Sequence, residues 1–189
     1  MPLYFAYGSN MDVAAMAQRC PRSASLGPAL LHRHRLVIMS EGYASVVRDP
    51  RHRVYGLLWD VALADVRALD AYESVATGLY RKALQPVKRL GGSGLRPLQQ
   101  ALVYLGRGDG GGVARPGYLE NVLACAEQLE FPAAYLAHIR TLGQVQRRGT
   151  PATGGVPSVE KMQRKPLAAQ RDSEGNIIVR TRFNSPMDR

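Results

Sequence analysis

The segment Tyr7-Gly8-Ser9-Asn10 joins an apolar run to a helical pattern and carries groups that can do chemistry. A glycine at such a junction lets the backbone approach a ligand, and the start of a helix offers free N–H groups. The segment therefore predicts a site that binds an anion or stabilises an oxyanion. The alternative is that Ser9 or Asn10 only caps the helix, and the sequence leaves both interpretations open.

Glu73 is the second candidate, because it breaks two rules of helix composition. In the helix predicted over 62–72, the apolar stripe contains Ala62, Val66 and Leu69, and position 73 continues that stripe. Glu73 also lies at the C-terminal end, where the helix dipole disfavours an anion. Desolvation and the dipole would both raise the carboxyl pKa toward the range of a general base that later acts as an acid. The alternative is a frayed last turn with Glu73 in solvent.

Three other patterns favour structural roles. Gly106–Gly111 matches G-x-G-x-x-G, but the next predicted helix starts too late to hold a pyrophosphate, so we predict a loop. His32 and His34 would share one face of a strand without a third ligand, which favours a solvent-facing polar edge over a metal site. Cys20 and Cys125 form no C-x-x-C pair, and a structural role is expected for both. We therefore predict no metal and no cofactor.

The predicted elements indicate an α+β fold, because strands dominate the first half and helices close the chain without strict β-α-β alternation. The sheet is expected to be largely antiparallel and barrel-like, with Pro50 separating the strand Ala44–Arg48 from the strand Val54–Val61. Strands are expected at 2–6, Leu30–Met39, Ala44–Arg48, Val54–Val61, Tyr80–Leu90 and Gln99–Leu105, and helices at Met11–Gln18, Ala62–Tyr72, Gly117–Leu129 and Ala133–Leu142.

Length and composition predict one globular domain with an extension. The chain has 189 residues, of which 46% are hydrophobic and 21% charged. We assign 1–148 to the domain and 149–189 to a basic extension that contains Gly and Pro. Alternating apolar residues over 175–183 predict a strand or hairpin there. It would dock on a sheet edge of its own chain or of a second copy, as in a homodimer.

Charge and hydropathy exclude two classes of protein. The formal net charge is +10, but the basic residues form no run, so we predict no nucleic-acid partner. No apolar stretch approaches the ~18 residues of a membrane span, and the N-terminus has no basic segment before an apolar run. A cytoplasmic location without membrane attachment is expected.

Four motifs, taken in order and spacing, resemble the gamma-glutamylcyclotransferases. They are Tyr7-Gly8-Ser9-Asn10-Met11, Val54-Tyr55-Gly56-Leu57-Leu58-Trp59, Leu69-Asp70-Ala71-Tyr72-Glu73-Ser74-Val75 with Gly78-Leu79-Tyr80, and Pro116-Gly117-Tyr118-Leu119. The resemblance extends to about Leu142. The family's fold, a small mixed β-barrel flanked by helices, agrees with the predicted elements.

The resemblance also implies a set of site residues. Those expected to hold a γ-glutamyl group are Tyr7, Gly8, Ser9, Asn10, Tyr80 and Tyr118. Glu73 is implied as the catalytic acid and base, and Tyr104 is a weaker match to a cavity residue. Where the family has Glu-Gly this chain has Glu73-Ser74, which keeps the carboxylate and puts the following turn in question.

The implied reaction is the attack of an α-amino group on the γ-carbonyl of the same glutamyl residue. It releases 5-oxoproline and an amine, and it needs no cofactor. The sequence does not identify the leaving amine, which can belong to an amino acid, a dipeptide, a lysine side chain or a specialised metabolite. The alternative function is a non-catalytic module on the same fold that binds a small molecule or a protein.

Overall fold

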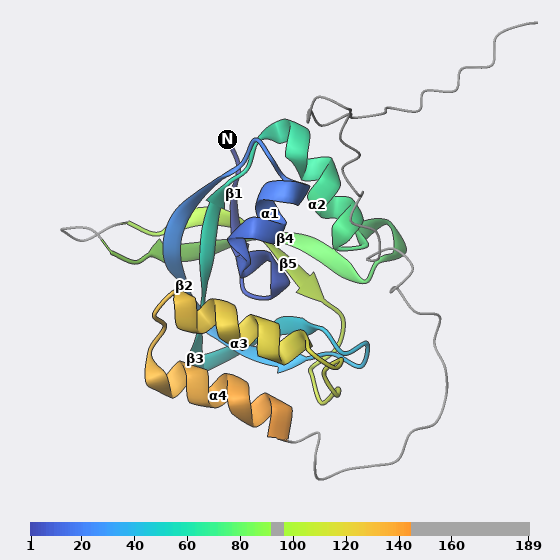
Figure 1. Ribbon diagram of the computed structural model, residues 1–189, viewed down its shortest axis with the longest axis vertical. Helices are drawn as coiled ribbons and strands as arrows, with labels where there is room; N and C mark the ends of the chain where they lie inside the picture. The colour runs from blue at the N-terminus through green and yellow to red at the C-terminus, as the bar shows by residue number, and fades with distance from the viewer. Residues whose placement is uncertain (92–96, 145–189) are drawn as a thin grey trace, which may run out of the picture. The chain divides into compact units, whose positions relative to one another are not determined.

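The described strands close into a mixed barrel in the order β1-β3-β2-β4-β5. The computed structural model describes residues 1–91 and 97–144 (Figure 1), and the predicted extension 149–189 lies outside them. Its strands are β1 (Leu3–Ala6), β2 (Ala24–Ile38), β3 (Ala44–Asp60), β4 (Tyr80–Arg89) and β5 (Gln99–Gly106). The α+β class and the barrel predicted from the sequence are confirmed.

The short strand β1 closes the barrel. Tyr4 pairs with Trp59 of β3 in antiparallel register and with Leu102 of β5 in parallel register. Phe5 and Ala6 are fully buried, and Tyr4 is 4% exposed. β1 is therefore covered on both edges and on both faces, which places the residues that follow it at one end of the barrel.

Four α helices and three 3-10 turns connect and flank the described strands. The α helices are α1 (Val13–Arg19), α2 (Val66–Tyr72), α3 (Tyr118–Gln128) and α4 (Ala133–Gln144), with 3-10 turns η1 (Ser9–Met11), η2 (Leu63–Asp65) and η3 (Val75–Thr77). α3 and α4 lie side by side (Figure 1), and an ion pair of 2.6 Å joins Arg140 to Glu127. The predicted helix over 62–72 is thus a 3-10 turn followed by α2.

A wide bulge in β2 and β3 corrects two predictions. His34 pairs with Arg48 and His32 pairs with Arg53, so four residues of β3 lie opposite Arg33 alone. Pro50 lies inside this bulge, where no ladder N–H is required, and β3 therefore continues where a break was predicted. Because Arg33 has a φ of 57°, the side-chain alternation is also broken. His34 is buried while His32 is exposed, so the two rings do not share a face.

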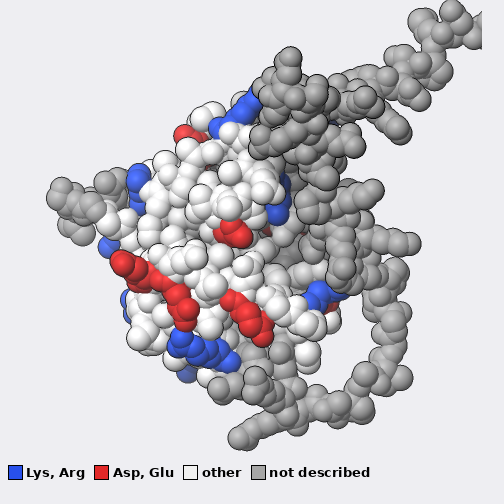
Figure 2. Space-filling model, in the orientation of Figure 1, with Lys and Arg blue, Asp and Glu red and all other residues white. Residues whose placement is uncertain are grey.

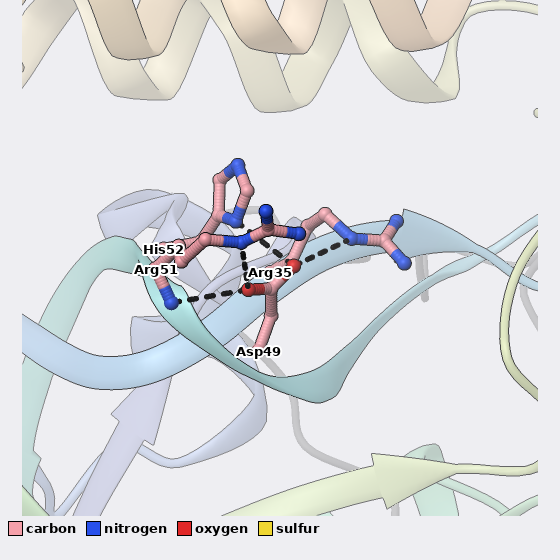
Figure 3. A network of polar contacts seen from close by, with 4 residues as sticks. All are labelled: Arg35, Asp49, Arg51 and His52. Atoms are coloured by element: carbon pink, nitrogen blue, oxygen red, sulfur yellow. Dashed lines mark hydrogen bonds and ion pairs between the residues drawn. The ribbon is translucent and has the colours of Figure 1, made fainter.

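The bulge gathers cationic side chains around one carboxylate (Figure 3). Asp49 lies 2.9 Å from His52 Nδ1 and 3.5 Å from Arg35 Nε, and it also accepts the backbone N–H of Arg51 at 3.1 Å. The hydrogen bonds from His52 and from the Arg51 backbone hold the pKa of the Asp49 carboxyl below its usual value. The network stabilises the bulged stretch between the two regular parts of β3.

Gly56 allows β3 to approach β1 closely. A Cβ at this position would collide with the carbonyl oxygen of Ala6 and would lie 2.7 Å from the ring of Phe5. We expect Gly56→Ala to lower the free energy of unfolding by about 3 kcal/mol, because neither neighbour can move without disturbing the buried strand. Urea denaturation measures this. A loss of unfolding free energy below ~0.5 kcal/mol would show that β1 can shift to make room for the methyl group.

Candidate active site

Glu73 lies directly after α2 and keeps the register of that helix. Its N–H donates to the carbonyl of Leu69 at 2.9 Å, so the last turn is formed and not frayed. The chain then reverses at Ser74, which has a φ of 52° in the left-handed region. A glycine adopts this conformation freely and serine at a cost of about 1 kcal/mol. The Glu-Ser departure from the family pattern thus preserves the turn.

Glu73 is half-buried as a residue, and its carboxyl group is the part withdrawn from solvent, among tyrosine rings. Burial raises its pKa from 4.5 to about 7, against the opposing effects of Arg19, Tyr4 and Asn10. The charge of Glu73 in turn contributes to the raised pKa of the hydroxyl groups of the surrounding tyrosines, which are Tyr4, Tyr7, Tyr80, Tyr104 and Tyr118. These rings come from β1, from the residue directly after β1, and from β4, β5 and α3, so Glu73 faces the end of the barrel.

Asn10 is the main hydrogen-bond donor to this carboxyl. Its Nδ2 donates to Glu73 Oε1 at 2.8 Å and to Tyr4 Oη at 2.9 Å, and its side chain is 2% exposed. The Tyr4 hydroxyl reaches Glu73 Oε1 at 3.5 Å. The interpretation of Asn10 or Ser9 as the helix cap is wrong, because Asp12 caps α1 by accepting the N–H of Ala15 at 3.0 Å.

Arg19 is a further residue that acts on the Glu73 carboxyl group. It was not predicted from the sequence, in which it is only a basic residue next to Cys20. Its Nη1 donates to Asn10 Oδ1. The guanidinium lies 3.5 Å from the centre of the Tyr72 ring, and the Tyr72 hydroxyl is 3.0 Å from Ser9 Oγ. No motif marks this arginine, since its contact with Tyr72 joins residues that are far apart in the sequence.

Gly8 lies against Tyr118, the first residue of α3. A Cβ on Gly8 would be 2.8 Å from Tyr118 Oη. That oxygen accepts the N–H of Ala44 at 3.1 Å, and a backbone hydrogen bond from Ser9 also acts on it. The loop, the start of β3 and the start of α3 therefore meet at one hydroxyl group.

The remaining predicted tyrosines also surround Glu73, but their hydroxyl groups are engaged by the backbone or by Asp70. Tyr80 donates to the carbonyl of Ala44 at 2.7 Å, and Tyr7 donates to the carbonyl of Tyr104. Tyr104 donates to Asp70 Oδ1 at 2.7 Å, and an ion pair of 2.8 Å joins Asp70 to Lys82. Asp70 thus ties α2, which carries Glu73, to β4 and β5.

The other candidates have structural environments. Cys20 is 1% exposed, and burial raises the pKa of its thiol to about 11, so its neighbouring arginines do not activate it. Gly112 lies so close to the backbone of Met39, which directly follows β2, that a Cβ would not fit. Close packing therefore accounts for a glycine at this position in the loop after β5. Within residues 1–91 and 97–144, no group of three or more His, Cys, Asp or Glu has the arrangement of a metal site.

The contact between Gly8 and the Tyr118 hydroxyl can be tested by a double-mutant cycle. We expect Gly8→Ala to lower the free energy of unfolding by about 2 kcal/mol, because the new methyl group collides with Tyr118 Oη. In a Tyr118→Phe background the same change should cost about 1 kcal/mol less, since the colliding oxygen is gone. Chemical denaturation of the four proteins measures the coupling. Additive losses would show that the methyl group is accommodated elsewhere.

Known proteins resemble this chain in sequence and in fold. Human and mouse proteins named gamma-glutamylcyclotransferase are 30% and 32% identical to it over 88 residues, covering 41% of this chain and 47% of each relative. The chain thus spans about half the length of the curated relatives it matches. A solved structure titled "Gamma-glutamyl cyclotransferase" has a TM-score of 0.67 at 23% identity, covering 86% of this chain and 96% of that chain. At this identity the structural likeness shows the fold alone.

The match to the family covers the candidate site itself. A sequence model described as "Gamma-glutamyl cyclotransferase, AIG2-like" matches residues 4–119. This range is more than half of the chain, and it begins at Tyr4 and includes Asn10, Glu73 and Tyr118. The chain therefore belongs to the gamma-glutamyl cyclotransferase, AIG2-like family.

Proposed function

We propose that this protein is a cyclotransferase that converts γ-glutamyl amides into 5-oxoproline and a free amine, with Glu73 as base and then acid. The observation that carries the proposal is a carboxyl group with a pKa of about 7, bound by Asn10 at 2.8 Å, next to the Gly8 loop. Membership of the family supports the same reaction class.

The pKa of Glu73 suits a group that must both accept and return a proton. The α-amino group of a γ-glutamyl compound is mostly protonated near pH 7 and is then not a nucleophile. The amine that leaves is a poor leaving group unless it is protonated. A carboxyl group whose pKa is close to neutrality can perform both transfers at small cost, whereas one near 4 is too weak a base.

The reaction then proceeds without a further reactant. Glu73 takes a proton from the α-ammonium group, and the amine nitrogen attacks the γ-carbonyl carbon to close a five-membered ring. The carbonyl oxygen becomes an oxyanion. As it returns to a carbonyl, the bond to the leaving nitrogen breaks and protonated Glu73 delivers its proton there. The ring nitrogen still carries two hydrogens and loses one of them as a proton to the departing amine, so the products are the neutral lactam and an ammonium ion. Glu73 is again a carboxylate, and the γ-glutamyl amide has become 5-oxoproline and a free amine.

Groups around Gly8 are suited to stabilise the oxyanion. Gly8 carries no side chain, the Tyr118 hydroxyl lies beside it, and the backbone N–H of Ser9 interacts with that hydroxyl. Preorganised donors of this kind commonly contribute several kcal/mol to the transition state. Because the substrate must fold its glutamyl chain into a ring, holding it between this loop and Glu73 also supplies a proximity effect.

The proposed partner is a small-molecule γ-glutamyl substrate. The face seen in Figure 2 carries acidic and basic side chains intermixed, which supports this assignment over a polyanion partner. In the part of the chain that the structure describes, no helix is long and apolar enough to cross a membrane. The homodimer and the cytoplasmic location stay predictions.

The first test replaces the proposed base. We expect Glu73→Gln to reduce 5-oxoproline release at least ~100-fold, because the amide keeps the shape and can still accept from Asn10 but cannot exchange a proton. A panel of γ-glutamyl amides supplies the substrate. The control is Glu120→Gln, which removes an exposed carboxylate from α3. A Glu73→Gln protein at the wild-type rate would exclude Glu73 as the base.

The second test is the pH dependence of the rate. Burial raises the pKa of Glu73 to about 7, so the carboxylate that serves as the base is lost as the pH falls below this value. We expect kcat/KM to fall about tenfold per pH unit on the acid side of 7. The substrate's own ammonium group also titrates, so substrates with different α-amine pKa values are compared. The midpoint of the fall in kcat/KM that is due to Glu73 should be the same for every substrate. A midpoint that always shifts with the pKa of the substrate's amine would contradict the assignment.

A further inference from the structure

The contacts of Arg19 form a chain that ends at the carboxyl group of Glu73. From Arg19 the chain runs through Asn10 Oδ1 and across the same amide to Nδ2, which donates to Glu73 Oε1 at 2.8 Å. On its other side the guanidinium stacks on Tyr72, the residue that precedes Glu73. Arg19 thus touches both the residue before the carboxyl group and the side chain that donates to it.

Arg19 determines which end of the Asn10 amide faces Glu73. An asparagine side chain has a donor end and an acceptor end of nearly the same shape, and only its partners distinguish them. Arginine can only donate, so it fixes Oδ1 on its own side. Nδ2 then points to Glu73 and to Tyr4, which it reaches at 2.8 and 2.9 Å. With the amide reversed, Oδ1 would face the carboxylate and repel it.

Arg19 is also the charged group that acts on Glu73 in the described part of the chain. The hydroxyl groups that face Glu73 from β1, β4, β5 and α3 belong to tyrosines, and burial raises the pKa of each, so they stay neutral around pH 7. Among the causes that act on Glu73, burial raises its pKa most and Arg19 opposes burial most. Removing the positive charge of Arg19 would therefore raise the pKa of Glu73 further.

We propose that Arg19 is a positioning residue for the proposed base, which orients the Asn10 amide toward Glu73 and supplies a positive charge that favours the ionised carboxylate. The inference depends on the proposed function only where it concerns the rate. Arg19 itself moves no proton and acts through Asn10 and through its positive charge.

Direct titration of Glu73 tests this without any substrate. Protein labelled with carboxyl ¹³C-glutamate is titrated by NMR, and Glu73→Gln identifies the signal. We expect Arg19→Gln to move the Glu73 midpoint to higher pH and Arg19→Lys, which keeps the charge, to move it less. The matched control is Arg67→Gln, an exposed arginine on α2, which should leave the midpoint unchanged. An unchanged midpoint in folded Arg19→Gln protein would overturn the proposal.

The rate provides the second readout. We expect Arg19→Gln to lose at least ~10-fold more kcat/KM at pH 6 than at pH 9, because the carboxylate recovers at high pH. A loss of equal size at both pH values, with an unmoved titration, would indicate a purely structural role and overturn the proposal. If the midpoint moves but Glu73→Gln keeps its activity, the proposed function fails while the role of Arg19 in ionising Glu73 stands.

Discussion

The site depends on one electrostatic balance, the desolvation of the Glu73 carboxyl group against the donors and the charge that favour its ionised form. Burial alone would leave a neutral acid, whereas full exposure would leave a weak base. Asn10, Tyr4 and Arg19 hold the pKa at about 7 between these limits. The barrel serves this balance, because β1 supplies Tyr4, η1 supplies Asn10, α1 supplies Arg19 and α2 ends at Glu73.

Tertiary contacts, more than regular secondary structure, fix the positions of Glu73 and of the groups around it. Asp70 joins α2 to the barrel through Tyr104 and Lys82, so the helix before Glu73 has little freedom to rotate. On the opposite side, the Tyr118 hydroxyl holds the Gly8 loop against the start of β3. Each contact joins segments that are distant in sequence, which keeps the loop and the carboxyl group in a constant relation.

The sequence allowed the position of Glu73 to be predicted, because helical spacing places it on the buried stripe after Leu69. It did not determine the partner of Asn10, since an asparagine near a helix start is equally suited to a cap, and only the structure shows Asp12 in that role. Arg19 could not be predicted because its contact depends on how two helices pack. Pro50 was misleading for a related reason, since a proline breaks a ladder only where its N–H is required, and the bulge removes that need.

The parallel pairing of β1 with β5 also has a kinetic consequence. Tyr4 reaches its partner Leu102 about a hundred residues later in the chain, whereas β2 and β3 pair through a short local turn. Contacts of long sequence separation form late and slowly, because their loop entropy must be overcome first. During synthesis β3 is available to pair with β1 before β5, so the barrel stays open until β5 has been made. Tyr4 and Asn10 meet Glu73 in their final geometry only when the barrel closes, so a partly folded chain would hold the carboxyl group in water as an ordinary weak base.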